Sequence, residues 1–143
     1  MGRPDTGGAG LRLLWMARLL MSGLIASPSP GGADPAMECG LDRGSQVEVA
    51  ECLAGTEEIV DRNVELALGF AMDAARELDV VTGRAVAVPA LEAGQAAWEA
   101  WRQAHCEFVG ATYGGGSGTG IAIRACRVEL GRARVSALME HAG

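Results

Sequence analysis

A glycine-rich run with a cysteine at equal distance on either side constrains this chain more than any other feature. Five of the seven residues from Gly114 to Gly120 are glycine. Such a run cannot sustain a helix, so the chain must turn there. Cys106 and Cys126 each lie ten residues from Gly116, within the run. If the flanking segments return as antiparallel helices, residues equidistant from the turn meet, and the spacing favours a Cys106–Cys126 disulfide.

Both flanking segments have the hydrophobic period of a helix. We predict one helix from about Ala90 to Val109, with Pro89 in its first turn, and another beginning at about Thr119 or Gly120. The stripe before the turn consists of Ala97, Trp98, Trp101, His105 and Phe108. The stripe after the turn consists of Ile121, Ala125, Val128, Val135, Leu138 and Met139, with Arg124, Arg127, Arg132 and Arg134 expected outward or at the edges.

A third helix is predicted to begin near Gln46. Ser45 and Glu48 have the spacing of a capping box, in which each side chain bonds the other's backbone amide. The apolar stripe that follows consists of Val49, Leu53, Val60, Val64, Leu68, Ala71, Ala75 and Leu78. Gly55 and Gly69 each weaken a helix by about 1 kcal/mol relative to alanine, so a break or kink near either fits the sequence.

The segments between and before these helices are predicted to be irregular. Residues 27–44 are rich in proline, glycine and serine and indicate a loose leader, and residues 79–88 indicate a connector with a short extended piece at Val86–Val88. The chain of 143 residues has room for one domain. We therefore predict an all-α fold, a small bundle of about three to four helices with two disulfides.

The first 33 residues have the features of a secretory signal and leader. Residues 11–26 are apolar with Arg12 and Arg18 among them, too short for the roughly 20 apolar residues of a membrane crossing. Cleavage before Asp34 and cleavage after Ala26 both fit, Met16 is an alternative start, and an uncleaved amphipathic anchor is the competing interpretation. We predict a signal and leader over residues 1–33, a helical domain over 34–143, and no stable membrane span after cleavage.

The four cysteines, Cys39, Cys52, Cys106 and Cys126, all lie within the predicted domain. An even number in an exported chain of this size indicates two disulfides and a periplasmic or extracellular location. Four cysteines allow three connectivities, of which symmetry about the turn favours Cys106–Cys126 with Cys39–Cys52. Each loop would add about 3 kcal/mol of stability by the chain-entropy estimate.

The charge balance excludes one class of partner and favours another. The chain has twelve arginines, no lysine and eighteen acidic residues, for a net charge of −6. Without residues 1–33, nine arginines face seventeen acids, a net charge of −8. Nucleic-acid binding is therefore not expected. An acidic exported protein favours cationic partners, although the simpler interpretation is that the charge keeps the protein soluble. Nothing in the sequence indicates an oligomeric state.

No arrangement of residues indicates an active site. Adjacent His105 and Cys106 would point about 100° apart on a helix, and no histidine has metal-ligand spacing with a cysteine. The glycine run lacks the lysine of a phosphate-binding loop. Glu57 and Glu58 are expected on a solvated helix face, and Trp98 and Trp101 in the core. We predict no catalytic residue, metal site or cofactor.

The block from Ala97 to Glu107, AWEAWRQAHCE, and the glycine-rich loop resemble the LprI-type lysozyme inhibitor family over about residues 39–140. The matching residues are Trp98, Arg102, Cys106, Gly115, Gly116, Ser117, Cys126, Arg134 and Leu138, with Cys39 and Cys52 at the positions of the family's first cysteine pair. The sequence departs from the family pattern at Gln103, where the family usually has aspartate, and at Asp61 and Asn63, which replace a fuller aspartate–leucine–asparagine signature.

The resemblance implies a periplasmic or extracellular helical protein with two disulfides that inhibits a cationic lysozyme. In that interpretation the tip of the hairpin is the candidate contact loop, with Tyr113, Ser117 and Thr119 as its contact residues. The alternative is a non-catalytic structural or assembly module of the bacterial envelope with no hydrolase target.

Overall fold

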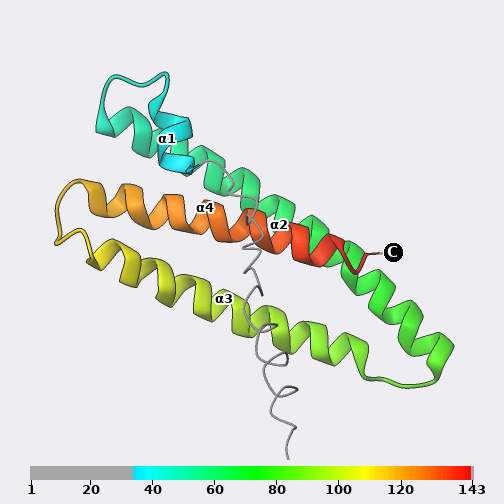
Figure 1. Cartoon of the computed structure of the whole chain (residues 1–143). Helices are drawn as coiled ribbons and strands as arrows, with labels where there is room; N and C mark the ends of the chain where they lie inside the picture. Colours follow the sequence, from blue (N-terminus) through cyan, green and yellow to red (C-terminus); the bar gives the residue numbers. More distant parts are fainter. Residues whose placement is uncertain (1–33, 143) are drawn as a thin grey trace, which may run out of the picture. The chain divides into compact units, whose positions relative to one another are not determined.

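Four α-helices and no strand make up residues 34–142, the part of the chain that the computed structural model describes. The helices are α1 (Pro35–Gly40), α2 (Gln46–Thr82), α3 (Ala87–Ala111) and α4 (Gly118–Met139) (Figure 1). The predicted all-α fold is confirmed. No helix in this part of the chain combines the length and the apolar character that a membrane crossing requires. The predicted signal and leader, residues 1–33, lie outside the described residues.

Helix α2 begins at the predicted capping box and runs without a break. Ser45 Oγ accepts from the backbone amide of Glu48 at 3.3 Å and donates to its Oε2 at 2.9 Å. The helix continues for 37 residues and ends at Gly83, whose φ of 65° permits the left-handed cap. The break that fits Gly55 or Gly69 does not occur. A cost of about 1 kcal/mol per glycine is small beside the burial of a seven-residue inner face along the same helix.

The connection between α2 and α3 is shorter than the predicted connector. Helix α2 extends to Thr82 and α3 begins at Ala87, so the extended piece at Val86–Val88 is wrong. The carboxylate of Asp79 accepts from the amides of these three residues at 3.0, 2.9 and 3.1 Å. These bonds, with that from Ala87 the largest, lower the pKa of Asp79. A side chain from α2 thus satisfies the free amides at the start of α3, which allows helix where the sequence indicated loop.

Helices α3 and α4 form the predicted hairpin. The turn contains Gly114 and Gly115 with φ of 67° and 80°, a conformation that glycine adopts without strain. Cys106 and Cys126 are disulfide-bonded across the pair with a Cα–Cα distance of 5.6 Å, as the symmetry about the turn predicted. Residues 118–120 belong to α4 and not to the turn. The two left-handed glycines suffice to reverse the chain, and Gly118 and Gly120 occupy the first turn of α4.

Helix α1 lies in the segment predicted to be a loose leader, and that part of the prediction is wrong. Asp34 Oδ1 accepts from the amide of Ala36 at 2.9 Å, and Pro35 occupies the first helical position. Cys39 is disulfide-bonded to Cys52 of α2. Both carboxylate oxygens of Glu38 accept from Arg132 of α4, at 3.0 and 2.8 Å, and this pairing lowers the pKa of Glu38. The helix is therefore fixed by residues distant in sequence.

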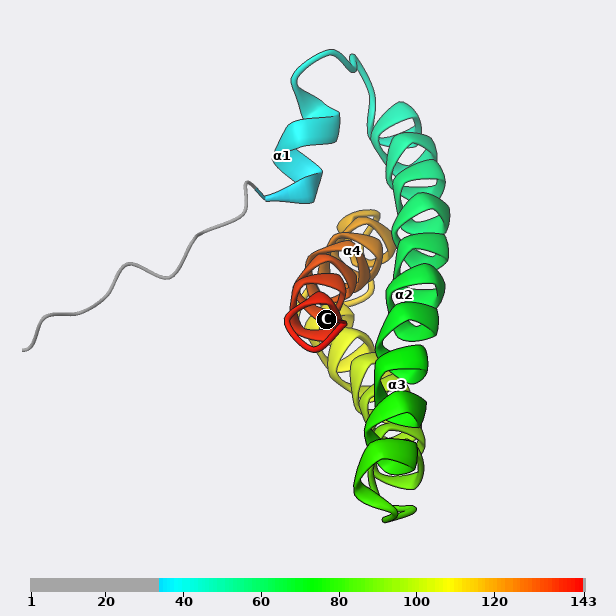
Figure 2. The same cartoon turned by 90° about the vertical axis from the view of Figure 1, so that its right-hand side faces the viewer.

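Helix α4 is central and packs against the other three helices (Figures 1 and 2). The buried cluster consists of Val64, Ala67 and Ala71 of α2 with Leu138 of α4, and it is flanked by Leu68, Leu91, Trp98 and Val135. Two glycines permit close helix contacts. A Cβ at Gly131 would overlap Val60 Cγ1 of α2, and one at Gly110 would overlap Ile123 of α4. Leu78 and Met139, predicted to point inward, are 54% and 47% exposed.

Candidate contact site

Trp98, Arg102 and Arg134 meet in one cluster between the helices. The guanidinium carbons of Arg102 and Arg134 lie 5.3 and 5.5 Å from the ring centre of Trp98. Both distances are in the range of a cation–π interaction. Arg134 Nε also donates to Oε1 of Gln95, a buried residue, at 2.9 Å. Trp98, Arg102 and Arg134 therefore fix α3 against α4.

Arg102 extends this cluster to α2. Its Nη2 donates to Asp61 Oδ1 at 2.8 Å. Nη2 and Nε also donate to the backbone carbonyl oxygen of Arg127, at 2.7 and 3.1 Å respectively. One arginine side chain thus bonds to two other helices. Asp61 is the acidic partner of this arginine.

A second set of charges lies next to it and corrects one prediction, that of Glu57 on a solvated face. Glu57 is 8% exposed and not on a solvated face. Its carboxylate accepts from Arg124 at 2.7 Å and lies 3.4 Å from Arg127, which donates to Glu107 at 2.8 Å. These two arginines lie at the edges of α4, as predicted, and pair with carboxylates of α2 and α3. A buried carboxylate requires such partners, and the period of the helix alone does not reveal them.

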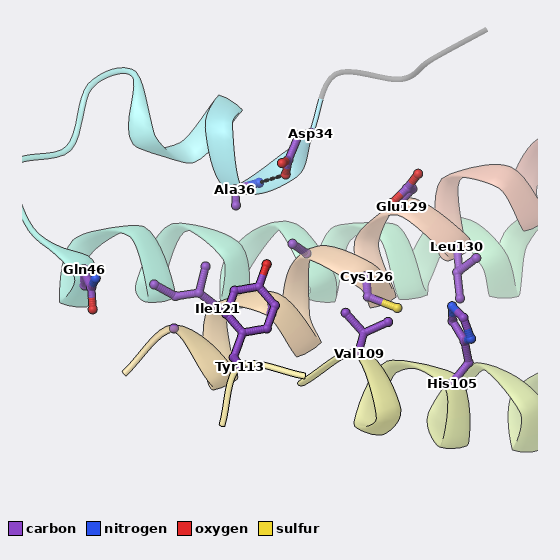
Figure 3. A pocket seen from close by; sticks show the side chains of 13 residues that line it. Asp34, Ala36, Gln46, His105, Val109, Tyr113, Ile121, Cys126, Glu129 and Leu130 are labelled. Carbon is purple, nitrogen blue, oxygen red and sulfur yellow. Dashed lines mark hydrogen bonds between the residues drawn. The ribbon is translucent and has the colours of Figure 1, made fainter. Parts of the chain in front are cut away.

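A groove at the hairpin end of the bundle is a candidate surface for a partner. The contact groove, as we name it, has a volume of about 470 Å³. Its lining residues are Asp34, Ala36, Gln46, His105, Val109, Tyr113, Gly118, Ile121, Ala122, Ala125, Cys126, Glu129 and Leu130. In Figure 3, His105 and Val109 extend from α3 toward α4, and Asp34 lies across the groove at the start of α1. The lining is largely apolar, with carboxylates at Asp34 and Glu129.

Aromatic side chains border this groove on the α3 side. Trp101, His105 and Phe108 recur at helical spacing, so they share one face of α3. Trp101 and Phe108 are 50% and 66% exposed, and the rings of Trp101 and His105 stack with centroids 5.0 Å apart. The prediction of Trp101 as a core residue is wrong. The inner face of α3 is instead formed by Gln95, Cys106 and Gly110, which turns this aromatic face to solvent.

The structure places the three predicted contact residues of the turn differently. Tyr113 is 58% exposed and lines the contact groove, and Ser117 is exposed. Thr119 lies in the first turn of α4, and its Oγ1 is buried without a hydrogen-bond partner among the described residues. Gly115 and Gly116 are exposed in the turn. Tyr113 and Ser117 are therefore accessible to a partner, whereas the hydroxyl of Thr119 is not.

The groove supplies groups for binding. Apolar side chains, exposed aromatic rings and two carboxylates surround it. All four cysteines are in disulfides, and residues 34–142 contain no group of three or more histidine, cysteine or acidic side chains arranged to hold a metal ion. Sequence reasoning missed Asp34 and Glu129, because only the packing of α1 beside α4 brings them to one groove.

The comparisons with known proteins point to one family. The family model described as "Lysozyme inhibitor LprI" matches residues 37–138, which include all four cysteines and all four described helices in whole or in large part. No curated protein and no solved structure matches the chain.

Proposed function

The chain belongs to the LprI family of lysozyme inhibitors, and from this membership we propose that it is an exported binding protein that inhibits a lysozyme-type cell-wall hydrolase. The family match over residues 37–138 is the observation that carries the proposal. The mature protein would act by occupying the hydrolase and not by catalysing a reaction.

The distribution of charge supports a cationic target. Of the seventeen acidic residues from position 34 onward, twelve form no salt bridge with a described residue. Only four of the nine arginines from position 34 onward form no salt bridge with a described residue. The negative charge is therefore carried mainly by carboxylates that no arginine within residues 34–142 neutralises. Such a surface raises the association rate with a cationic protein, and salt screens the effect over roughly 10 Å at 0.1 M.

The contact groove and the aromatic face beside it are the surface that we assign to the hydrolase. Interfaces obtain most of their binding energy from a few residues, among which tryptophan, tyrosine and arginine are enriched. Trp101 and Tyr113 present such rings at the edge of the groove. Asp34 and Glu129 in its lining suit a lysine or arginine side chain of the target. The family-motif residues Trp98, Arg102 and Arg134, in contrast, hold the helices together.

A turbidity assay of lysozyme on bacterial cell walls tests the proposal. We expect the purified protein to lower the lytic rate at micromolar concentration, and less so at high salt. An unchanged lytic rate at that concentration would remove the proposal of inhibition.

Two substitutions test the assigned surface. We expect Tyr113→Ala to raise the half-inhibitory concentration roughly tenfold or more, and Glu129→Gln to weaken inhibition more at low than at high salt. Phe70→Ala is the matched control. Phe70 is also an exposed aromatic residue, at 56%, but it lies 24 residues along α2 from Gln46, the α2 residue that lines the groove. Equal inhibition by all variants would reject this surface while leaving inhibition itself intact.

Export is part of the same proposal. Two disulfides are typical of oxidising compartments, and we assign residues 1–33 as the signal and leader that direct the chain there. Mass spectrometry of the protein from its native compartment would then find a mature N-terminus at Asp34 or Ser27. A chain that retains Met1 or Met16 would contradict cleavage.

A further inference from the structure

A second groove is lined by the C-terminal part of α2, the start of α3 and the end of α4. Figure 1 shows these helix segments away from the turn that joins α3 to α4. The groove has a volume of about 480 Å³ and is lined by Ala71, Ala74, Ala75, Leu78, Ala87, Leu91, Arg134, Ala137, Leu138 and His141. Eight of these ten residues are apolar, and the two ionisable ones are basic. We name it the alanine groove.

The width of this groove results from small side chains. Five of its lining residues are alanines, on three different helices. Ala71, Ala75 and Leu138 are buried and form its floor, and Leu78 is left 54% exposed at its wall. Methyl side chains extend only a short way from the helices, so apolar surface remains open to solvent. The volume is in the range of small-molecule sites, about 300–1,000 Å³.

The charge at the groove is opposite to that of the protein as a whole. Arg134 is fixed by its bond from Nε to Gln95 and by the ring of Trp98. Its two NH2 groups have neither a hydrogen-bond nor a salt-bridge partner within residues 34–142. Asp79, the carboxylate next to the lining residue Leu78, is occupied by the three amides at the start of α3. The guanidinium of Arg134, with donors that are not used by residues 34–142, therefore borders the apolar alanine groove.

We propose that the alanine groove binds a single-chain amphiphile with an anionic head group, of the fatty-acid class. The alkyl chain lies along the alanines and leucines, and the carboxylate accepts hydrogen bonds from Arg134, with His141 beside it. Arginine pairs with a carboxylate through two parallel N–H···O bonds, and its two NH2 groups supply donors here. The inference is independent of lysozyme inhibition, because this groove and the contact groove share no lining residue.

Isothermal titration of the full chain with dodecanoate, below its micelle concentration, tests the proposal. We expect saturable one-to-one binding. Decanoate should bind roughly ten- to twentyfold more weakly, because each buried methylene contributes a factor of about four. Dodecyltrimethylammonium, with the same chain and a cationic head, should bind at least tenfold more weakly than dodecanoate.

A large side chain introduced into the alanine groove should block the binding site. Ala137 is an exposed residue of the lining, so Ala137→Trp fills the groove without disturbing the core, and we expect it to weaken dodecanoate binding at least tenfold. Ala133→Trp is the control. It is exposed on the same helix one turn earlier and does not line the groove, so its binding should equal that of the unmodified chain. Both variants retain residues 1–33, so any binding by that segment cancels.

Three results would overturn the proposal. They are equal binding of the anionic and cationic amphiphiles, equal binding by the two tryptophan variants, and binding to phosphatidylglycerol vesicles without binding of monomeric dodecanoate. The last would indicate a membrane-surface contact instead of a groove for single chains.

Discussion

The close contact of α2 and α4 at Gly131 gives the sharpest test of the packing. A Cβ added at Gly131 would overlap Val60 Cγ1 and lie 3.4 Å from Arg102 NH2. Overpacking of this kind costs about 1–3 kcal/mol. Alanine also gains about 1 kcal/mol over glycine from helix propensity, so the single variant Gly131→Ala mixes two opposite effects.

Gly94→Ala separates them. Gly94 lies inside α3, is exposed, and has nothing within 4 Å of an added Cβ, so that variant should be stabilised by the propensity gain alone. We expect Gly131→Ala to be less stable than Gly94→Ala by about 1–3 kcal/mol in urea unfolding, or by roughly 4–15 °C in Tm.

The Val60→Ala background completes the test. Removing the Val60 methyl groups removes the overlap, so the gap between the two glycine variants should close to under about 0.5 kcal/mol. Equal stability of Gly131→Ala and Gly94→Ala in the unmodified background would refute the close approach of the two helices. A gap that persists with Val60→Ala would refute Val60 as its cause.

Three further predictions concern the cross-links and the charges. Replacing Cys106 and Cys126 together with alanine should cost about 3 kcal/mol by loop closure over a sequence separation of 20, and an unchanged urea midpoint would contradict this. Trp98→Leu should cost about 1–3 kcal/mol, since it removes two cation–π contacts along with aromatic packing, and a loss below 0.5 kcal/mol by circular dichroism would argue against the cluster. Because the pKa of Asp79 is lowered in the folded state, its contribution is present above about pH 3.9 and is lost as the pH falls through the lower folded value. The Tm difference between the unmodified chain and Asp79→Ala should therefore be larger at pH 7 than at pH 2, and a constant difference would contradict the capping role.

The residues on which the sequence resemblance to the family rests are not those that we assign to the hydrolase interface. Trp98, Arg102 and Arg134 lie in a cluster that joins three helices. They stabilise the packing of α3 and α4 on α2. A substitution there should therefore change inhibition by lowering the stability of the fold. Tyr113, Trp101 and Glu129 lie at the surface, where substitution should change binding and leave the fold intact.

The sequence by itself determined the local elements and the hairpin. The capping box at Ser45 predicted the start of α2, because its hydrogen bonds are made between residues three positions apart. The glycine run predicted the turn, and the equal spacing of Cys106 and Cys126 favoured their disulfide, since an antiparallel pair brings equidistant residues together. These features depend on short-range geometry, which the order of residues fixes.

Only the tertiary structure decided which faces are covered. The contacts that give Asp61, Glu57 and Glu38 their partners join residues 41, 67 and 94 positions apart, and no periodic pattern encodes such pairings. The same holds for α1, which is fixed by its disulfide and by Arg132, and for the outward turn of Trp101. Both grooves are lined by residues of three or more helices, which only the packing brings together. A helical period shows that a face is apolar, but the neighbours that cover it are set by the packing of the whole bundle.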